Sequence, residues 1–127
     1  MDALFAAHSG IRYLVLFAGL VALVWFAYGT LAGRPFVRPS PAFLTGFIGL
    51  LDVQILLGIA LVIGGRRPPA VWGHLAVMLT AAVVVHVLAA RHKRRPRPAS
   101  HRLPLLAVAI TLALVVVGIL AIGRPIL

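Results

Sequence analysis

The stretch AVWGHLAVMLTAAVVVHVLAAR, residues 70–91, decides the fold of this protein. At about 1.5 Å of rise per residue, a helix of this length crosses a hydrocarbon core of about 30 Å. Two histidines, His74 and His86, interrupt the otherwise apolar run. Because a polar side chain in lipid is costly without a partner, this helix needs neighbouring helices.

The composition of the whole chain supports a membrane protein. Hydrophobic residues make up 62% of the 127 residues, and 12 Lys+Arg against 2 Asp+Glu give a net charge of +10. The basic residues lie between apolar runs, as in membrane topology, and form no basic helix face with aromatic residues, so nucleic-acid binding is not expected. The absence of cysteine excludes disulfides, iron–sulfur ligation and covalently attached c-type haem.

Proline and glycine divide the chain into four apolar segments that form a single membrane domain, residues 1–127. We expect helices at about residues 4–32, 42–63, 70–90 and 103–122. The connections are short, so consecutive helices must be antiparallel neighbours. The sequence therefore predicts an all-α fold, a four-helix transmembrane bundle with up-down-up-down topology.

Basic residues are distributed unequally between the two ends of this bundle. One end carries eight of them: Arg34, Arg38, Arg91, Lys93, Arg94, Arg95, Arg97 and Arg102. The end that holds both termini carries four: Arg12, Arg66, Arg67 and Arg124. The positive-inside rule predicts a multi-pass protein of the bacterial inner (cell) membrane with both termini extracytoplasmic. The basic loop, residues 91–102, should attract anionic lipids at about 1 kcal/mol per basic residue.

Two histidines are candidates for a cofactor site. His8 and His74 lie near the same end of the first and third helices, which face each other diagonally in an up-down bundle. Two imidazoles at one level are the geometry that holds a b-type haem through its iron. Arg12, Arg66 and Arg67 lie at the same end and would bind the propionates. Alternatively, His8 is an interfacial residue and His74 bonds a neighbouring carbonyl.

Asp52, Gln54 and His86 are the other polar candidates within the apolar runs. Asp52 and His86 lie on adjacent helices at levels that differ by roughly 8 Å, a gap that tilt and side-chain reach can close. A buried carboxylate–imidazole pair of this kind carries protons, holds a quinone head group or serves only as a buried polar lock between helices. Gln54 is about 200° around the helix from Asp52, so it should bond to a different helix.

Three short motifs carry a resemblance to a known family. HSGIRYLVL at residues 8–16, DVQILLG at 52–58 and WGHL at 72–75 resemble small four-helix bacterial membrane proteins that are often labelled cytochrome-b-like. The resemblance implies that His8, Gln54 and His74 occupy the polar positions of that family. Asp52 stands where the family pattern has histidine, which removes any ligand role there. Gly73 and Leu75 replace the Glu and Pro that flank the family's third-helix histidine.

These observations predict a haem b-binding membrane protein or subunit for electron transfer, with a quinone as a second ligand. One alternative is a non-catalytic accessory subunit at the edge of a larger respiratory or photosynthetic membrane complex. Another is a small proton-coupled exporter. Other membrane subunits or further copies of the chain are the expected partners. No nucleophile–base pair or phosphate-binding loop marks the chain as an enzyme by itself.

Overall fold

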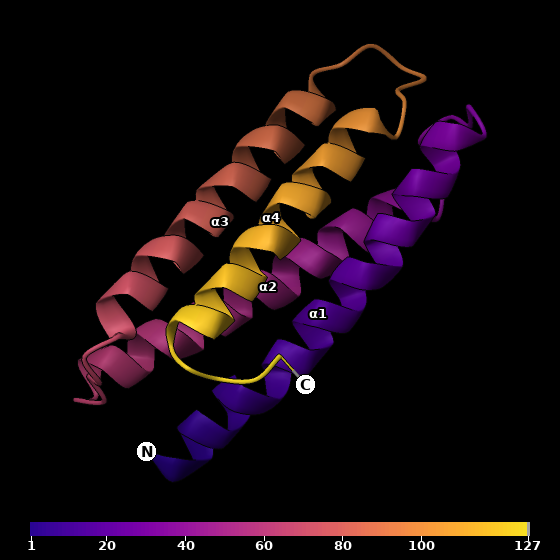
Figure 1. Cartoon of the computed structure of the whole chain (residues 1–127). Helices are drawn as coiled ribbons and strands as arrows, with labels where there is room; N and C mark the ends of the chain where they lie inside the picture. Colours follow the sequence, from indigo (N-terminus) through magenta and orange to yellow (C-terminus); the bar gives the residue numbers. More distant parts are fainter. Residues whose placement is uncertain (127) are drawn as a thin grey trace.

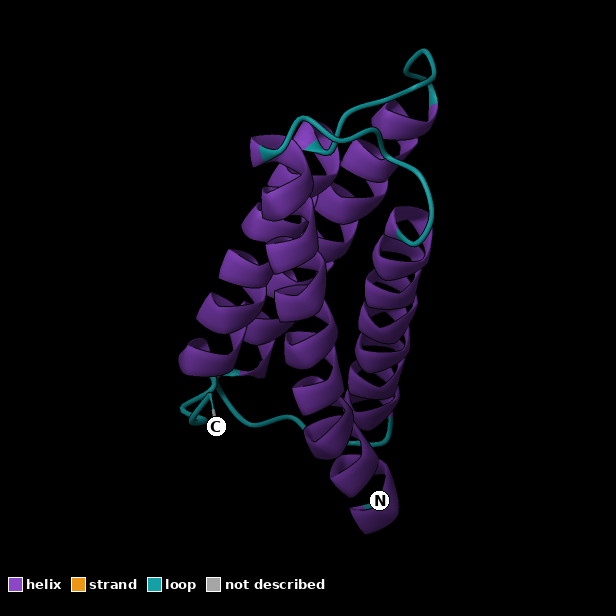
Figure 2. Cartoon of the chain, turned by 90° about the vertical axis from the view of Figure 1, so that its right-hand side faces the viewer, coloured by secondary structure: helices purple, strands orange, loops and turns teal. Residues whose placement is uncertain are grey.

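Four long helices make up the fold in the computed structural model, which describes residues 1–126 (Figures 1 and 2). They are α1 (Asp2–Leu31), α2 (Ser40–Ile63), α3 (Val71–Lys93) and α4 (Arg102–Ala121). Each is long and apolar enough to cross a membrane. The predicted four-helix bundle is confirmed, and the largest difference in bounds is at α3, which continues to Lys93 instead of ending at residue 90.

The bundle consists of two helical hairpins. α1 packs closely against α2, and α3 against α4, while α1 also contacts α4 and α2 touches α3 less extensively. α1 and α3 therefore lie diagonally across the bundle, as the short connections predict. Both termini lie at the same end (Figure 1). We call this end the pocket end, and we call the opposite end, which holds the loops 32–39 and 94–101, the basic end.

The core consists of side chains from all four helices. The largest fully buried ones include Val15, Phe26, Phe47, Val85 and Val108. Gly19 allows α1 to approach its neighbours, since a Cβ there would lie 2.8 Å from Phe47 Cε2. Between helices in lipid, such close van der Waals packing replaces the hydrophobic driving force of soluble proteins.

The two loops of the basic end are joined through Phe36. Its backbone N–H donates to the Ala99 carbonyl at 2.8 Å, and its ring centre lies 4.3 Å from that of His92 and 5.2 Å from that of His101. Both imidazoles are only 2% exposed. The predicted basic loop over residues 91–102 is shorter in the structure, because α3 continues to Lys93 and α4 begins at Arg102, and the Phe36 ring packs against the two buried histidines.

Candidate cofactor site

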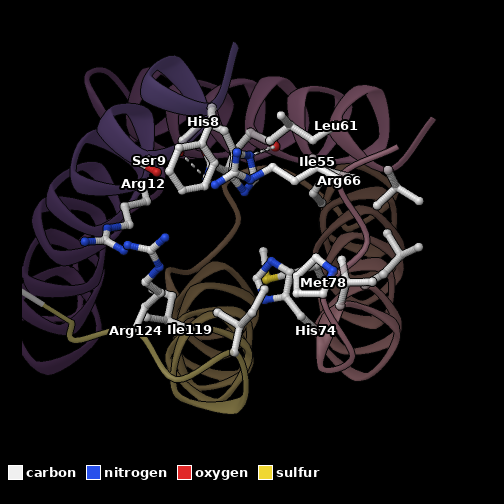
Figure 3. A pocket seen from close by; sticks show the side chains of 18 of the residues that line it. His8, Ser9, Arg12, Ile55, Leu61, Arg66, His74, Met78, Ile119 and Arg124 are labelled. Atoms are coloured by element: carbon white, nitrogen blue, oxygen red, sulfur yellow. Dashed lines mark hydrogen bonds between the residues drawn. The ribbon is translucent and has the colours of Figure 1, made fainter. Parts of the chain in front are cut away.

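A cavity opens between the two hairpins at the pocket end (Figure 3). It has a volume of about 120 Å³, and all four helices contribute to its walls. Ligand pockets in proteins are lined mainly by apolar side chains with a few precisely placed polar groups. Here the inner wall is apolar, and histidines and arginines provide the polar groups.

His8 enters the cavity from α1 and is held by α2. Its Nδ1 donates to the Gln54 backbone carbonyl at 3.1 Å, and the Gln54 side-chain amide donates back to the His8 carbonyl at 2.8 Å. Because a carbonyl only accepts, Nδ1 carries the proton and Nε2 keeps its lone pair. Gly58 provides the space, since a Cβ there would lie 3.0 Å from His8 Cε1.

His74 enters from α3 and is held by α4 in the same way. Its Nδ1 donates to the Gly118 carbonyl at 2.7 Å, which again leaves Nε2 with a lone pair. A Cβ on Gly118 would lie 3.6 Å from this Nδ1 and 3.0 Å from the Met78 sulfur. An imidazole whose other nitrogen donates to a carbonyl is the usual arrangement of a metal-ligating histidine, because that bond fixes the tautomer and the ring orientation.

The two imidazoles face each other across the cavity (Figure 3). Their ring centres are 6.4 Å apart and their planes are nearly perpendicular, at 86°. A transition metal lies about 2.0–2.1 Å from an imidazole nitrogen, which is itself about 1.2 Å from the ring centre. Two imidazoles on opposite sides of one metal atom therefore have ring centres about 6.4 Å apart. The observed spacing matches this value.

Positive charge surrounds the mouth of the cavity. Arg66 and Arg124 stack on Phe5, with their guanidinium carbons 3.7 Å and 5.2 Å from the ring centre. Arg12 donates to the Tyr13 hydroxyl at 2.6 Å, and its Nε is buried without a partner. Within residues 1–126, no carboxylate lies within salt-bridge distance of these arginines. The mouth is suited to anionic groups of a ligand.

Of the residues predicted to bind the haem, Arg67 lies outside the cavity. Its Nε donates to the Val62 carbonyl at 2.9 Å, where it caps the end of α2. Met78 and Arg124 line the cavity but were not predicted. Met78 lies one turn after His74 on the same helix face, and Arg124 follows the last helix at the pocket end, so helical periodicity and topology could have indicated both.

Asp52 and His86 form a hydrogen-bonded carboxylate–imidazole pair between α2 and α3. The imidazole Nε2 lies 2.9 Å and 3.1 Å from the two carboxylate oxygens. Their side chains are 41% and 53% exposed, so the expectation that this pair is buried is wrong. The pair lies on the outer surface of the bundle because α2 and α3 are packed less closely than the other neighbours. Gln54 is buried and bonds to α1, as its position around the helix predicts.

A second polar cluster, which the sequence did not reveal, ties three helices together at the basic end. Trp25 Nε1 donates to Ser40 Oγ at 2.8 Å, and the Ser40 hydroxyl donates to His101 Nε2 at 2.8 Å. His101 Nδ1 donates to the Arg34 carbonyl at 3.0 Å. We call this cluster the basic-end network. Its neighbour His92 is equally buried, yet neither of its ring nitrogens has a partner.

Comparison of the chain with protein-family models, curated proteins and solved structures found no match. The fold and the site alone therefore define the class: a bundle of four helices that can each cross a membrane, with a cavity between its hairpins that two facing histidines and three arginines line.

Proposed function

We propose that the chain binds a b-type haem between its two hairpins and acts as an electron carrier in a membrane. The observation that carries this proposal is the pair His8 and His74. Their ring centres are 6.4 Å apart, and each Nδ1 is bonded to a backbone carbonyl. Both Nε2 atoms are thereby available to the iron, which would supply one-electron chemistry.

The other residues of the cavity are also suited to a haem. Within residues 1–126 the three arginines at the mouth have no carboxylate partner, and they match two propionates because guanidinium–carboxylate hydrogen bonds are among the strongest in proteins. Gln54 Oε1 and Arg12 Nε are buried without partners beside the cavity, so polar groups there remain to be satisfied. Gly58 and Gly118 leave the room that the two imidazoles occupy.

The proposal includes a membrane location. The four apolar helices support a multi-pass protein. The excess of basic residues at the basic end favours placing that end in the cytoplasm and the cavity near the extracytoplasmic face of a bacterial cell membrane. His8 and His74 would hold a haem at a level where it would supply one-electron exchange with a membrane quinone or with a partner protein on the outer side.

Titration with haemin tests the proposal. The purified protein in detergent should bind one haemin per chain and give a low-spin spectrum with a sharp α-band on reduction. His8→Ala and His74→Ala should each abolish the low-spin form. His86→Ala is the matched control, because this histidine lies outside the cavity and should leave the spectrum unchanged. No haemin binding, or equal loss in all three variants, contradicts the proposal.

A second candidate is an accessory subunit, which the half-exposed Asp52–His86 pair favours. These residues lie well within helices that can cross a membrane, and ionisable side chains at such depth normally face protein or water. Gly46 and Gly49 lie open on α2 nearby, and small residues allow another helix to approach. In this case the double variant Asp52→Leu/His86→Leu should keep its fold but lose co-purifying membrane subunits or self-association.

A further inference from the structure

We propose that a cavity between the end of α1 and the beginning of α4, at the basic end, binds the phosphate group of an anionic phospholipid. It has a volume of about 490 Å³ and is lined by three arginines, Arg34, Arg95 and Arg102. The site is separate from the histidine cavity at the pocket end, and the inference does not depend on haem binding.

The three arginines come from three different segments of the chain. Arg34 follows α1, Arg95 lies in the loop after α3, and Arg102 is the first residue of α4. The backbone at Arg34 is held in place because its carbonyl accepts from His101, and Gly29 provides the room for that imidazole. The basic-end network thus fixes one wall of the cavity.

Charge identifies the ligand as an anion. The chain has only two acids, Asp2 at the beginning of α1 and Asp52, which is paired with His86. No carboxylate is among the residues that line the cavity, so its three arginines contribute like charges without neutralisation; the Arg34 guanidinium carbon also lies 5.5 Å from the centre of the Tyr28 ring. Guanidinium groups are suited to phosphate because their planar N–H donors bind its oxygens in pairs. The positive end of the α4 helix dipole adds to the attraction.

The remaining lining indicates a lipid rather than a small anion. Leu103 and Leu106 continue the cavity along α4 away from its basic rim, and Leu106 is 49% exposed. A head group on the arginines would therefore be followed by an acyl chain along apolar side chains. The arginines lie at the ends of helices that can cross a membrane, which is the level of the head groups.

Charge-matched variants distinguish lipid binding in this cavity from lipid binding to a general basic surface. The cavity variant is the triple substitution Arg34→Gln/Arg95→Gln/Arg102→Gln. The control is Arg91→Gln/Arg94→Gln/Arg97→Gln, which removes the same charge from exposed residues of the same region that do not line the cavity. Native mass spectrometry of the full chain in detergent, titrated with phosphatidylglycerol, measures the fraction that retains one lipid; phosphatidylcholine serves as the zwitterionic comparison.

We expect one retained phosphatidylglycerol per chain, with affinity lowered at least about ten-fold in the cavity variant and less than about three-fold in the control. Equal losses in the two triple variants would mean a diffuse basic collar and overturn the proposal. Displacement of the lipid by inorganic phosphate at a concentration no higher than the lipid's would assign the site to free phosphate instead. If the cavity variant loses helicity by circular dichroism, the single variants Arg102→Gln and Arg97→Gln provide the same comparison.

Discussion

The two buried histidines of the basic end allow a sharp test of how the bundle is held together. His92 and His101 are both 2% exposed and contact the same Phe36 ring, yet only His101 has hydrogen-bond partners. We predict that His101→Leu is strongly destabilising and that His92→Leu is neutral or stabilising. Both substitutions replace an imidazole with an apolar side chain of similar size.

The magnitude follows from the bonds that each substitution removes. His101→Leu removes the bonds to the Ser40 hydroxyl and the Arg34 carbonyl, and it leaves a buried hydroxyl and a carbonyl without their partners. A lost hydrogen bond that leaves a buried group unsatisfied costs about 1–3 kcal/mol, and an ordinary net hydrogen bond is worth about 0.5–1.5 kcal/mol. The buried Ser40 hydroxyl and the part-buried Arg34 carbonyl together therefore amount to about 1.5–4.5 kcal/mol. His92→Leu removes two buried unpartnered nitrogens, and replacing an unsatisfied polar group with an apolar one relieves its desolvation cost.

Reversible unfolding in mixed micelles provides the assay. The free energy of unfolding is measured from the loss of far-ultraviolet circular dichroism as the fraction of sodium dodecyl sulfate increases. The His101→Leu protein should unfold at a clearly lower fraction than the wild type, and the His92→Leu protein at the same or a higher fraction. Equal destabilisation by the two substitutions would refute the assignment of the basic-end network.

Four further predictions concern glycines and the residue that positions His8. Gly29→Ala should destabilise the protein by about 1–3 kcal/mol because the new Cβ overlaps the buried imidazole of the basic-end network. In the same unfolding assay, Gly46→Ala should raise the free energy of unfolding by about 0.5–1 kcal/mol. Alanine has a higher helix propensity than glycine, and the new Cβ meets no atom within 4 Å. In haemin titrations, Gly58→Ala should weaken binding because its Cβ would lie 3.0 Å from the His8 ring, whereas Gly49→Ala, with open space around it, should not. Gln54→Leu removes the amide that bonds the His8 backbone carbonyl but keeps the backbone carbonyl that accepts from His8 Nδ1. It should therefore lower haemin affinity by less than about ten-fold, while the helix content by circular dichroism stays unchanged. An unchanged affinity in Gln54→Leu would contradict a positioning role for its amide.

Much of the fold was predictable because its determinants are local. Apolar runs long enough to cross a membrane, separated by proline and glycine, give four helices, and short connections give antiparallel neighbours. The diagonal placement of α1 and α3 follows from that topology. The meeting of His8 and His74 depends only on this arrangement and on their similar distance from the helix ends, so sequence reasoning could anticipate it.

The features that sequence reasoning missed depend on contacts between distant loops and on helix rotation. His101 is buried because it packs against Phe36 and bonds to Ser40, which both lie more than sixty residues earlier in the sequence. The sequence does not indicate this burial, because the arginines near both histidines predict a solvated loop from charge density alone. The exposure of the Asp52–His86 pair depends on how α2 and α3 turn about their axes, which the near-uniform hydrophobicity of both helices does not specify.

The central claim is that His8 and His74 ligate one haem iron from opposite sides, and electron paramagnetic resonance of the ferric protein tests it most directly. Because the two imidazole planes are 86° apart, the iron orbitals that interact with the rings become nearly equal in energy. The claim therefore predicts a low-spin signal of the strongly anisotropic type, which is lost in both His8→Ala and His74→Ala. A high-spin signal in the wild-type protein, or a low-spin signal that survives both substitutions, would contradict it.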